Sequence, residues 1–243
     1  MLKGVSPLIA YVMVILIVFS GISLVLLFGM PLIERARESS IVNEGLENLK
    51  LLSKNIEEVA TEGIGSLRSI PLKVTGGEYK INEKTNSIEF YYSPKTYSVE
   101  PGFLKEDNII LISGSNAIAK EYDLDNDGEN EIVLENEFLK VGILKKGSKE
   151  NYDFINTSKL IKIINFKAKG IDLIPSDSSI FIDDREDSSY GYGYSETLNL
   201  GKSSTKAEAL VHLNTSYADY DILYTLYAGA DFLLIKVLKI AYK

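Results

Sequence analysis

Lys3-Gly4-Val5-Ser6-Pro7, followed by LIAYVMVILIVFSGISLVLLF at residues 8–28, is the stretch that decides how this chain is built. No side chain in residues 8–28 carries a charge, and fifteen of them are Leu, Ile, Val or Phe. About 21 residues form a helix about 31 Å long, which matches a bilayer hydrocarbon core of about 30 Å. We therefore expect this segment to enter a membrane.

The apolar run differs from a removable secretory signal. Such signals have an apolar core of about 7 to 15 residues and a small-residue cleavage site after it. The present run is longer, and Phe28-Gly29-Met30-Pro31 does not have the composition of such a site. The helix is expected to stay on the mature protein.

The residues before the run, Lys3-Gly4 and then Val5-Ser6-Pro7, resemble the class III signal peptide of archaeal type IV pilin-like proteins. In that family a prepilin-type peptidase cuts after the glycine and leaves the hydrophobic helix in place. The resemblance implies a cut between Gly4 and Val5, a cytoplasmic N-terminus and an exported remainder. It covers about the first forty residues, with a looser match over 57–92. Many bacterial pilins have a glutamate at the fifth mature position, which is Ile9 here, so that acid's role in assembly is missing.

The chain then divides into four parts. We expect a class III signal peptide at 1–4, a transmembrane helix at 5–30, an amphipathic helix at 31–63 and an extracellular β-rich domain at 64–243. Gly29 and Pro31 mark an expected kink, and Gly63 an expected helix end. In the second helix, apolar residues recur in steps of three and four: Val42, Leu46, Leu49, Leu52, Ile56 and Val59. This stripe would pack on the protein's own β domain, on neighbouring subunits, or on both at different heights.

Short apolar runs separated by turn residues follow, without alternating helices. This pattern predicts an α+β protein, with the long helix followed by an antiparallel β-sandwich-like domain. Residues 176–195, rich in Ser, Asp, Gly and Tyr, are expected to form a loop. The runs expected to be strands are 69–74, 78–82, 87–92, 108–113, 131–134, 138–144, 160–166, 179–182, 197–200, 207–213, 221–227 and 232–242.

Composition excludes several functions. Lys3 is the only charged residue before Glu34, so the remainder carries 25 basic and 34 acidic residues, net −9. An acidic domain lacks the basic footprint that binding to nucleic acid requires. There is no Cys and the only imidazole is His212, so thiol chemistry and multi-His metal sites are excluded. We expect no enzymatic activity.

The sharpest site signal is Asp123-Leu-Asp125-Asn-Asp127-Gly128-Glu129-Asn-Glu131. Alternate acids in a tight loop can direct their oxygens at one hard cation, and glycine permits the sharp turn. Leu134 stands where an EF-hand needs its bidentate Glu, so the loop instead resembles calcium loops of extracellular β proteins. The expected structural Ca²⁺ ligands are the side chains of Asp123, Asp125, Asp127 and Glu131 and the backbone carbonyl of Glu129. The alternative is a solvated acidic turn without metal.

Three weaker features lie further along the chain. Asn156 and Asn214 each begin an Asn-Thr-Ser sequon and are candidate glycosylation sites if the domain is exported. Tyr190, Tyr192 and Tyr194 alternate with glycines, so an extended chain would place three rings on one face. Such a row binds sugars or a partner surface, or packs within the protein. The acidic residues 183–187 are expected to be a solvated loop.

Two functions of different classes remain. The first is a structural, pilin-like subunit of an archaeal surface filament with a role such as adhesion, inserted in the membrane before assembly and self-associating through its N-terminal helix. A bound Ca²⁺ would stabilise its outer domain. The second is a minor pilin or single-pass anchored extracellular protein that binds a sugar or another surface ligand.

Overall fold

The structure is a computed structural model that describes residues 7–83, 85–95, 100 and 102–243. The chain divides into two compact units, Met1–Ser98 and Val99–Lys243. The expected cleavage site at Gly4 and Val5 lies outside the described residues. The class is α+β, because one long N-terminal helix precedes antiparallel sheets, as the sequence predicted.

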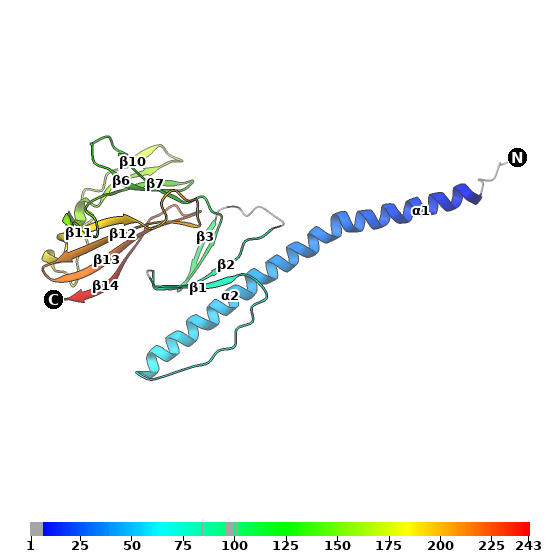
Figure 1. The fold of residues 1–243 in the computed structure, drawn as a ribbon, viewed down its shortest axis with the longest axis horizontal. Coiled ribbons are helices and arrows are strands. Elements are labelled where there is room, and N and C mark those ends of the chain that lie inside the picture. Colours follow the sequence, from blue (N-terminus) through cyan, green and yellow to red (C-terminus); the bar gives the residue numbers. More distant parts are fainter. Residues whose placement is uncertain (1–6, 84, 96–99, 101) are drawn as a thin grey trace. The chain divides into compact units, whose positions relative to one another are not determined.

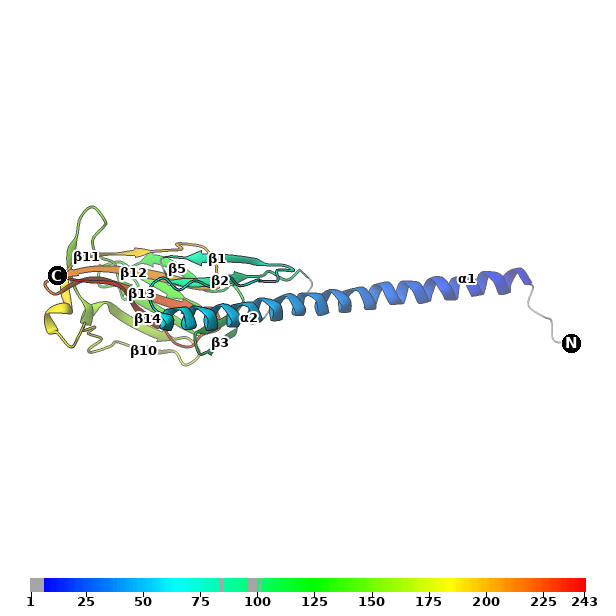
Figure 2. The same ribbon diagram turned by 90° about the horizontal axis from the view of Figure 1, so that it is seen from below.

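The first unit is built on one continuous helix, visible in both ribbon views (Figures 1 and 2). It consists of α1 (Pro7–Leu24), a π-helical turn η1 (Val25–Gly29) and α2 (Met30–Glu62). Pro31 has no N–H to give to the preceding turn, and a π turn is one way in which a helix accommodates this. The expected interruption near Gly29 therefore takes the form of a π turn. Gly63 follows the helix with a φ of 97°, in the left-handed region that favours glycine.

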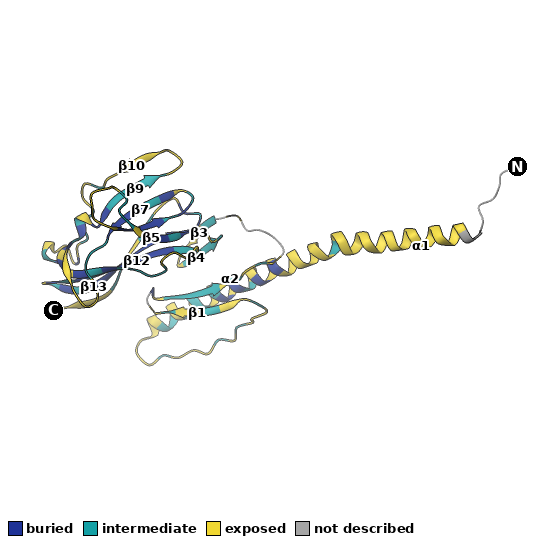
Figure 3. Ribbon diagram, turned by 45° about the horizontal axis from the view of Figure 1, so that its top comes forward, coloured by how far each residue is buried: buried dark blue, intermediate teal, exposed yellow. Residues whose placement is uncertain are grey.

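The apolar helix surface is not covered by the residues that the structure describes. The stretch Ile9–Glu62 contains the one described helix that is long and apolar enough to cross a membrane, and none of its most apolar window is buried. Ile17 is 70% exposed and Phe19 is 65% exposed. Figure 3 shows this exposure along almost the whole of α1, with buried positions confined to α2. By length and composition, the helix is consistent with membrane anchoring.

A β-hairpin packs on one face of α2. Strand β1 (Glu78–Asn82) pairs with β2 (Ser87–Tyr91). The buried helix residues are Glu38, Ile41, Gly45 and Asn48, again in steps of three and four. This face differs from the stripe expected from the sequence, in which Val42 and Ile56 remain 42% and 52% exposed. Leu46, Leu49, Leu52 and Val59 of the stripe are half-buried, and the contact itself is centred on the face where a glycine allows close approach.

Phe90 is the centre of that contact. A Cβ at Gly45 would lie 2.3 Å from the Phe90 ring, and a Cβ at Gly77 would lie 2.4 Å from it. The ring thus occupies space that only glycines leave open on both sides. Beside it, Asn48 Nδ2 donates to the Lys73 carbonyl at 2.6 Å and to the Tyr79 hydroxyl at 2.9 Å, so the buried amide is paired.

In the second unit, the described residues form twelve strands in antiparallel pairs. They are β3 (Gly102–Glu106), β4 (Ile109–Ser113), β5 (Ile118–Tyr122), β6 (Glu131–Glu135), β7 (Leu139–Leu144), β8 (Asp153–Asn156), β9 (Ile161–Phe166), β10 (Ile171–Leu173), β11 (Tyr190–Thr197), β12 (Lys206–Thr215), β13 (Ala218–Tyr227) and β14 (Leu234–Tyr242). One five-stranded sheet has the order β10-β9-β7-β6-β5, another has the order β14-β13-β12-β11-β8, and β3 and β4 form a separate pair. Single 3₁₀ turns, η2 (Thr157–Lys159) and η3 (Glu186–Ser188), lie in the connections.

The core of this unit is shared by both five-stranded sheets. In β12, Ala207, Ala209, Val211 and Leu213 are all 0% exposed, which is the period-two alternation of a strand with one buried face. They belong to one cluster with Ile132 of β6, and β12 contacts both β5 and β6. Burial on both inner faces fixes the register of the strands, and with it the positions of the loops at their ends.

Several strand boundaries differ from the expectation. Residues 69–74 form no strand, and residues 197–200 and 179–182 lie mostly outside strands. Conversely, residues 190–197 form β11, in the sheet between β8 and β12, although residues 176–195 were expected to be a loop. Alternation of Tyr and Gly is itself the pattern of a half-buried strand. It was not recognised from the sequence because glycine has no apolar side chain that would mark the buried face. Strands β3, β5, β8 and β10 were missed because they are short and rich in charged or polar residues.

We predict that Gly45→Ala has opposite effects with and without Phe90. In the wild-type background the new Cβ meets the ring and should destabilise the helix–hairpin contact by about 1 to 3 kcal/mol. In a Phe90→Ala background the collision is gone, and replacing a helical glycine should stabilise α2 by about 1 kcal/mol. Hydrogen exchange of α2 and hairpin amides measures both effects. Equal gains in protection in the two backgrounds would show that Phe90 does not fill this space.

Candidate metal centre

The acidic loop joins β5 to β6. These strands pair antiparallel, and their last pair is Tyr122 with Glu131. Asp123 comes directly after Tyr122, so it and Glu131 lie at the same end of the hairpin. The register of one hairpin thus brings together two acids eight positions apart, as the motif required.

The loop is folded by its own carboxylates. Asp125 Oδ1 accepts from the Asp127 N–H at 3.1 Å, and Asp127 Oδ1 accepts from the Glu129 N–H at 2.8 Å. Asp123 Oδ2 accepts from the Gly128 N–H at 2.9 Å. Asn126 and Gly128 have φ values of 60° and 89°, in the left-handed region that Asn and Gly adopt most readily. The residues of this loop therefore fit a tight turn in which side-chain oxygens accept hydrogen bonds from backbone N–H groups.

Three carboxylates converge. Asp123, Asp125 and Glu131 each offer an oxygen, and these oxygens all lie within 4.8 Å of one another. Two oxygens on opposite sides of a Ca²⁺, each at about 2.4 Å, would be about 4.8 Å apart. The spacing is therefore compatible with one shared cation. Asp125 is exposed, Asp123 is half-buried and Glu131 is fully buried.

Two oxygens of this cluster are unsatisfied. Glu131 Oε2 accepts from the Leu124 N–H at 2.7 Å, but Oε1 is buried and has no hydrogen-bond partner. Asp123 Oδ1 is likewise buried without a partner. Burial raises the pKa of the Glu131 carboxyl, the Leu124 hydrogen bond opposes this, and the charges of Asp125 and Asp127 raise it further. A buried, unpaired carboxylate is among the more costly arrangements in a protein.

The side chain of Asp127, an expected ligand, and that of Glu129, whose backbone carbonyl was the expected ligand, have partners outside the cluster. Asp127 Oδ2 accepts from Lys162 Nζ of β9, and Glu129 Oε1 accepts from Lys146 Nζ at 2.6 Å. Lys162 also lies 3.4 Å from Glu129 Oε2. The hydrogen bond from Lys162 lowers the pKa of Asp127, and that from Lys146 lowers the pKa of Glu129. The structure thus brings together Asp123, Asp125 and Glu131, while the side chains of Asp127 and Glu129 face lysines.

These lysines were missed by the sequence analysis. Lys162 is 35 positions from Asp127, and nothing in its own strand singles it out. Only the tertiary arrangement of β9 relative to the hairpin connects them.

The aromatic residues form a second feature of the same unit. Phe154 of β8 lies 6.3 Å from Tyr190 and 5.9 Å from Tyr192 between ring centroids, and Tyr152 lies 5.7 Å from Tyr194. Phe154 is 56% exposed and Tyr192 is 61% exposed. We call these five residues the aromatic surface; Tyr152 and Phe154 had not been identified from the sequence.

The glycines between the tyrosines have a structural reason. A Cβ at Gly193 would lie 1.9 Å from the His212 carbonyl oxygen, and one at Gly191 would lie 2.3 Å from that of Asn214. Strand β12 therefore approaches β11 too closely for any side chain at these two positions. The three rings lie on the opposite face, as an extended chain predicted.

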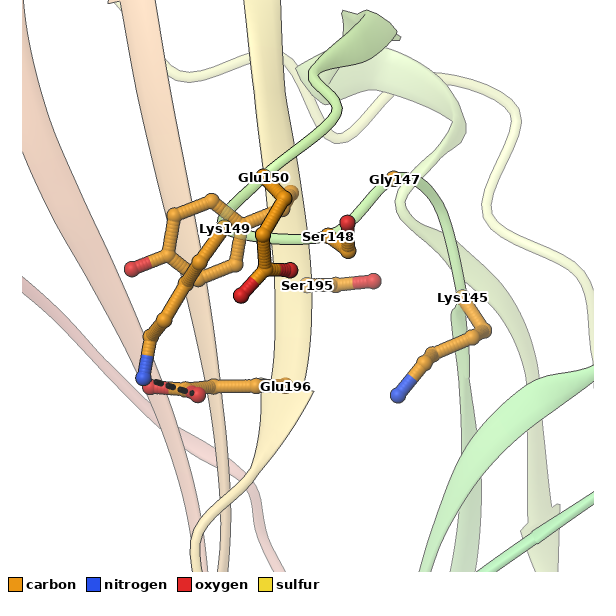
Figure 4. A pocket seen from close by; sticks show the side chains of 8 residues that line it. Lys145, Gly147, Ser148, Lys149, Glu150, Ser195 and Glu196 are labelled. Atoms are coloured by element: carbon orange, nitrogen blue, oxygen red, sulfur yellow. Dashed lines mark ion pairs between the residues drawn. The ribbon is translucent and has the colours of Figure 1, made fainter.

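An open pocket of about 270 Å³ adjoins Tyr194 (Figure 4). Its two lysines are already paired, Lys149 with Glu196 at 2.6 Å and Lys145 with Glu121 at 2.9 Å. No free cation therefore lines it that could hold an anion. Its lining residues are Lys145, Gly147, Ser148, Lys149, Glu150, Tyr194, Ser195 and Glu196.

Both sequon asparagines border the aromatic surface. In the sheet register, Asn156 pairs with Tyr190 and Asn214 pairs with Tyr192. Asn156 Oδ1 accepts from the Ser158 N–H at 3.0 Å and caps η2, while Asn214 Nδ2 donates to Asp219 at 3.2 Å. Both asparagines are half-buried on the outer side of the sheet.

His212 and the acidic residues 183–187 have ordinary structural partners. His212 Nδ1 lies 2.8 Å from Asp221 Oδ1. Arg185 forms a two-point contact with Asp187, with both distances 3.0 Å, and its guanidinium lies over the Tyr217 ring. Comparisons with protein-family models, with curated proteins and with solved structures find no match for this chain.

We predict that Glu131→Gln stabilises the protein in the presence of a chelator. The change removes a buried charge, and the new amide N–H can donate to the orphaned oxygen of nearby Asp123. Relief of one unsatisfied group is worth about 1 kcal/mol or more, or about 2 to 4 °C in melting temperature for a chain of this size. Glu129→Gln, in the same loop but exposed and paired with Lys146, should give no gain. A lower melting temperature for Glu131→Gln in chelator would contradict this account of Glu131.

Proposed function

We propose that this chain is a structural, pilin-like subunit of an archaeal surface filament. The observation that carries the proposal is the apolar surface of α1, which is exposed all round and has no partner in its own chain among the described residues. Water cannot solvate such a surface at low cost, so lipid covers it before assembly and other copies of the helix cover it afterwards.

Three features favour assembly over simple anchoring. The start Lys3-Gly4-Val5 resembles the processing site of pilin-like proteins, whose helix remains for packing. Gly21, with nothing within 4 Å of an added Cβ, lies between Ser20 and Ser23 and offers a neighbouring helix close approach. Beyond the apolar part, α2 leaves Val42 and Ile56 exposed on a face that the hairpin does not cover.

In this proposal the unit Val99–Lys243 is the outer domain and its two five-stranded sheets are arranged as a sandwich. The shared core supports that arrangement, since residues of both sheets belong to one cluster. No reaction is assigned to the domain; its role is to form the outside of the fibre. Export of this domain would also make Asn156 and Asn214 available for glycosylation.

The aromatic surface favours a second candidate, a minor pilin or single-pass anchored protein that binds a saccharide. Tyr190, Tyr192 and Phe154 offer exposed ring faces, on which sugar rings can stack. Asn156 and Asn214 add polar groups beside them. Fibres that contain this chain in bulk favour the first function, and its absence from fibres favours the second.

We predict that the native protein begins at Val5. N-terminal sequencing or intact mass of protein from the producing cells measures this directly. Gly4→Val should block the cut, because a β-branched side chain replaces the glycine before the scissile bond. Leu2→Val introduces the same side chain elsewhere in the leader and should be processed normally. A native chain that retains Met1, or that starts after residue 28, would exclude pilin-like processing.

We also predict that Gly21→Leu leaves membrane insertion intact but strongly reduces fibres sheared from cells. Leucine favours the bilayer, so insertion is preserved, but its bulk blocks close helix approach at this position. Ile22→Leu, a substitution of equal size at the next residue, is the matched control and should assemble normally. Wild-type fibre yield from Gly21→Leu cells would show that Gly21 is not in a packed helix contact.

A further inference from the structure

We propose that the β5–β6 connection binds one Ca²⁺ through Asp123, Asp125 and Glu131, and that Asp127 exchanges Lys162 for the ion when it binds. All of these residues lie in the unit Val99–Lys243. The site is therefore independent of whether the chain forms filaments, and the two proposals can fail separately.

The two unpaired oxygens point to a ligand that binds at this loop. Glu131 is 0% exposed and its Oε1 has no partner, and Asp123 Oδ1 is in the same condition. Among the described residues of the unit, Asn116 Oδ1 is the one other buried side-chain N or O atom without a hydrogen-bond partner. Asn136, 2% exposed, donates to the carbonyls of Tyr227 and Ala230 and accepts from two backbone amides. A cation between the carboxylates would satisfy both orphaned oxygens at once.

The donor set selects the kind of ion. All three groups are carboxylates, which suit hard cations, and the chain has no cysteine and one distant histidine for softer metals. Mg²⁺ demands a near-ideal octahedron and keeps most of its waters, whereas Ca²⁺ accepts irregular sets of six to eight oxygens. A loop closed by side chain–backbone hydrogen bonds, with carboxylates of unequal burial, fits calcium better.

Lys162 explains how the loop remains folded before the ion arrives. Its ammonium neutralises Asp127 and lies 3.4 Å from Glu129, but it is not a partner of either orphaned oxygen. A dication in the cluster repels the ammonium and attracts the Asp127 carboxylate, the third acid of the alternating series. Lys162 keeps Glu129 as its partner after the exchange, so no charge is left without one.

The first experiment titrates Ca²⁺ into the full chain in detergent, in metal-free buffer, by calorimetry. We expect one ion per chain, with a Kd of about 10⁻³ M or tighter, as in extracellular calcium modules. Asp125→Asn, at an exposed position where the new amide oxygen can still accept from the Asp127 N–H, should weaken binding about tenfold or more. Asp184→Asn removes an exposed carboxylate from the other acidic loop and should leave the Kd unchanged. No binding at millimolar Ca²⁺, or equal affinity for Asp125→Asn and wild type, would overturn the site.

The second experiment tests the exchange. Lys162→Met should tighten Ca²⁺ binding, since Asp127 no longer has to leave a partner. The same change in an Asp127→Asn background should produce a clearly smaller gain. If the lysine acts only by repelling the ion, the gain is the same in both backgrounds and the exchange is excluded, while the three-carboxylate site stands. If Lys162→Met weakens binding, the lysine supports the site and the exchange is wrong.

Discussion

Burial of the inward side chains of β12 and β13 is the interaction on which the unit Val99–Lys243 depends. Strand β12 is central in its sheet, and its inner residues contact the neighbouring sheet through β5 and β6. Fully buried Tyr220 and Tyr224 add large apolar area from β13. Tyr220 stays compatible with that burial because its hydroxyl donates to the Ser188 carbonyl at 2.7 Å, and burial raises its pKa to about 12. Once this core fixes the strand register, the loops at the strand ends have fixed positions as well.

The contrast between Asn136 and Glu131 shows how the unit treats buried polar groups. Asn136 lies between β6 and β7 and uses both ends of its amide, two donors to the β13–β14 turn and an acceptor for its own turn. It therefore ties the two sheets together without leaving a polar atom unpaired. Glu131, at the other end of β6, is equally buried but has one oxygen unpaired. The unpaired oxygen leaves Glu131 able to accept one more partner, which the proposed Ca²⁺ would supply.

The first unit follows a different rule. Its helix is too apolar at one end to be solvated, and at the other end it is covered on one face only. Phe90 between Gly45 and Gly77 defines the covered face, because glycines at both positions let the hairpin approach. The exposed remainder of α2 is the part left for contacts outside the unit. The unit Val99–Lys243 thus has a core of its own, whereas the most apolar window of the helix is not buried among the described residues.

The sequence by itself determined the apolar helix, its end near Gly63, the α+β class and the acidic hairpin loop. These features depend on local composition and on period, which a single chain carries in its own order of residues. It also indicated that Asp123 and Glu131 could meet, since a tight turn joins them. Strands β8 and β11 escaped notice because their burial comes from neighbouring strands and not from a run of apolar residues.

Only the tertiary structure decided which acids face one another and which face lysines. Lys146 and Lys162 reach the loop from the end of β7 and from β9, respectively, at separations that no local pattern encodes. The same holds for the aromatic surface, in which Tyr152 and Phe154 join the tyrosines of β11 through strand pairing. It holds also for the covered face of α2. The spacing of apolar residues allowed several faces of the helix to be covered, and the fit of Phe90 between Gly45 and Gly77 selected one of them. The local order of residues determines which helices and strands form. Contacts between distant elements determine which side chains become partners, because charge pairing and close packing depend on the register across strands.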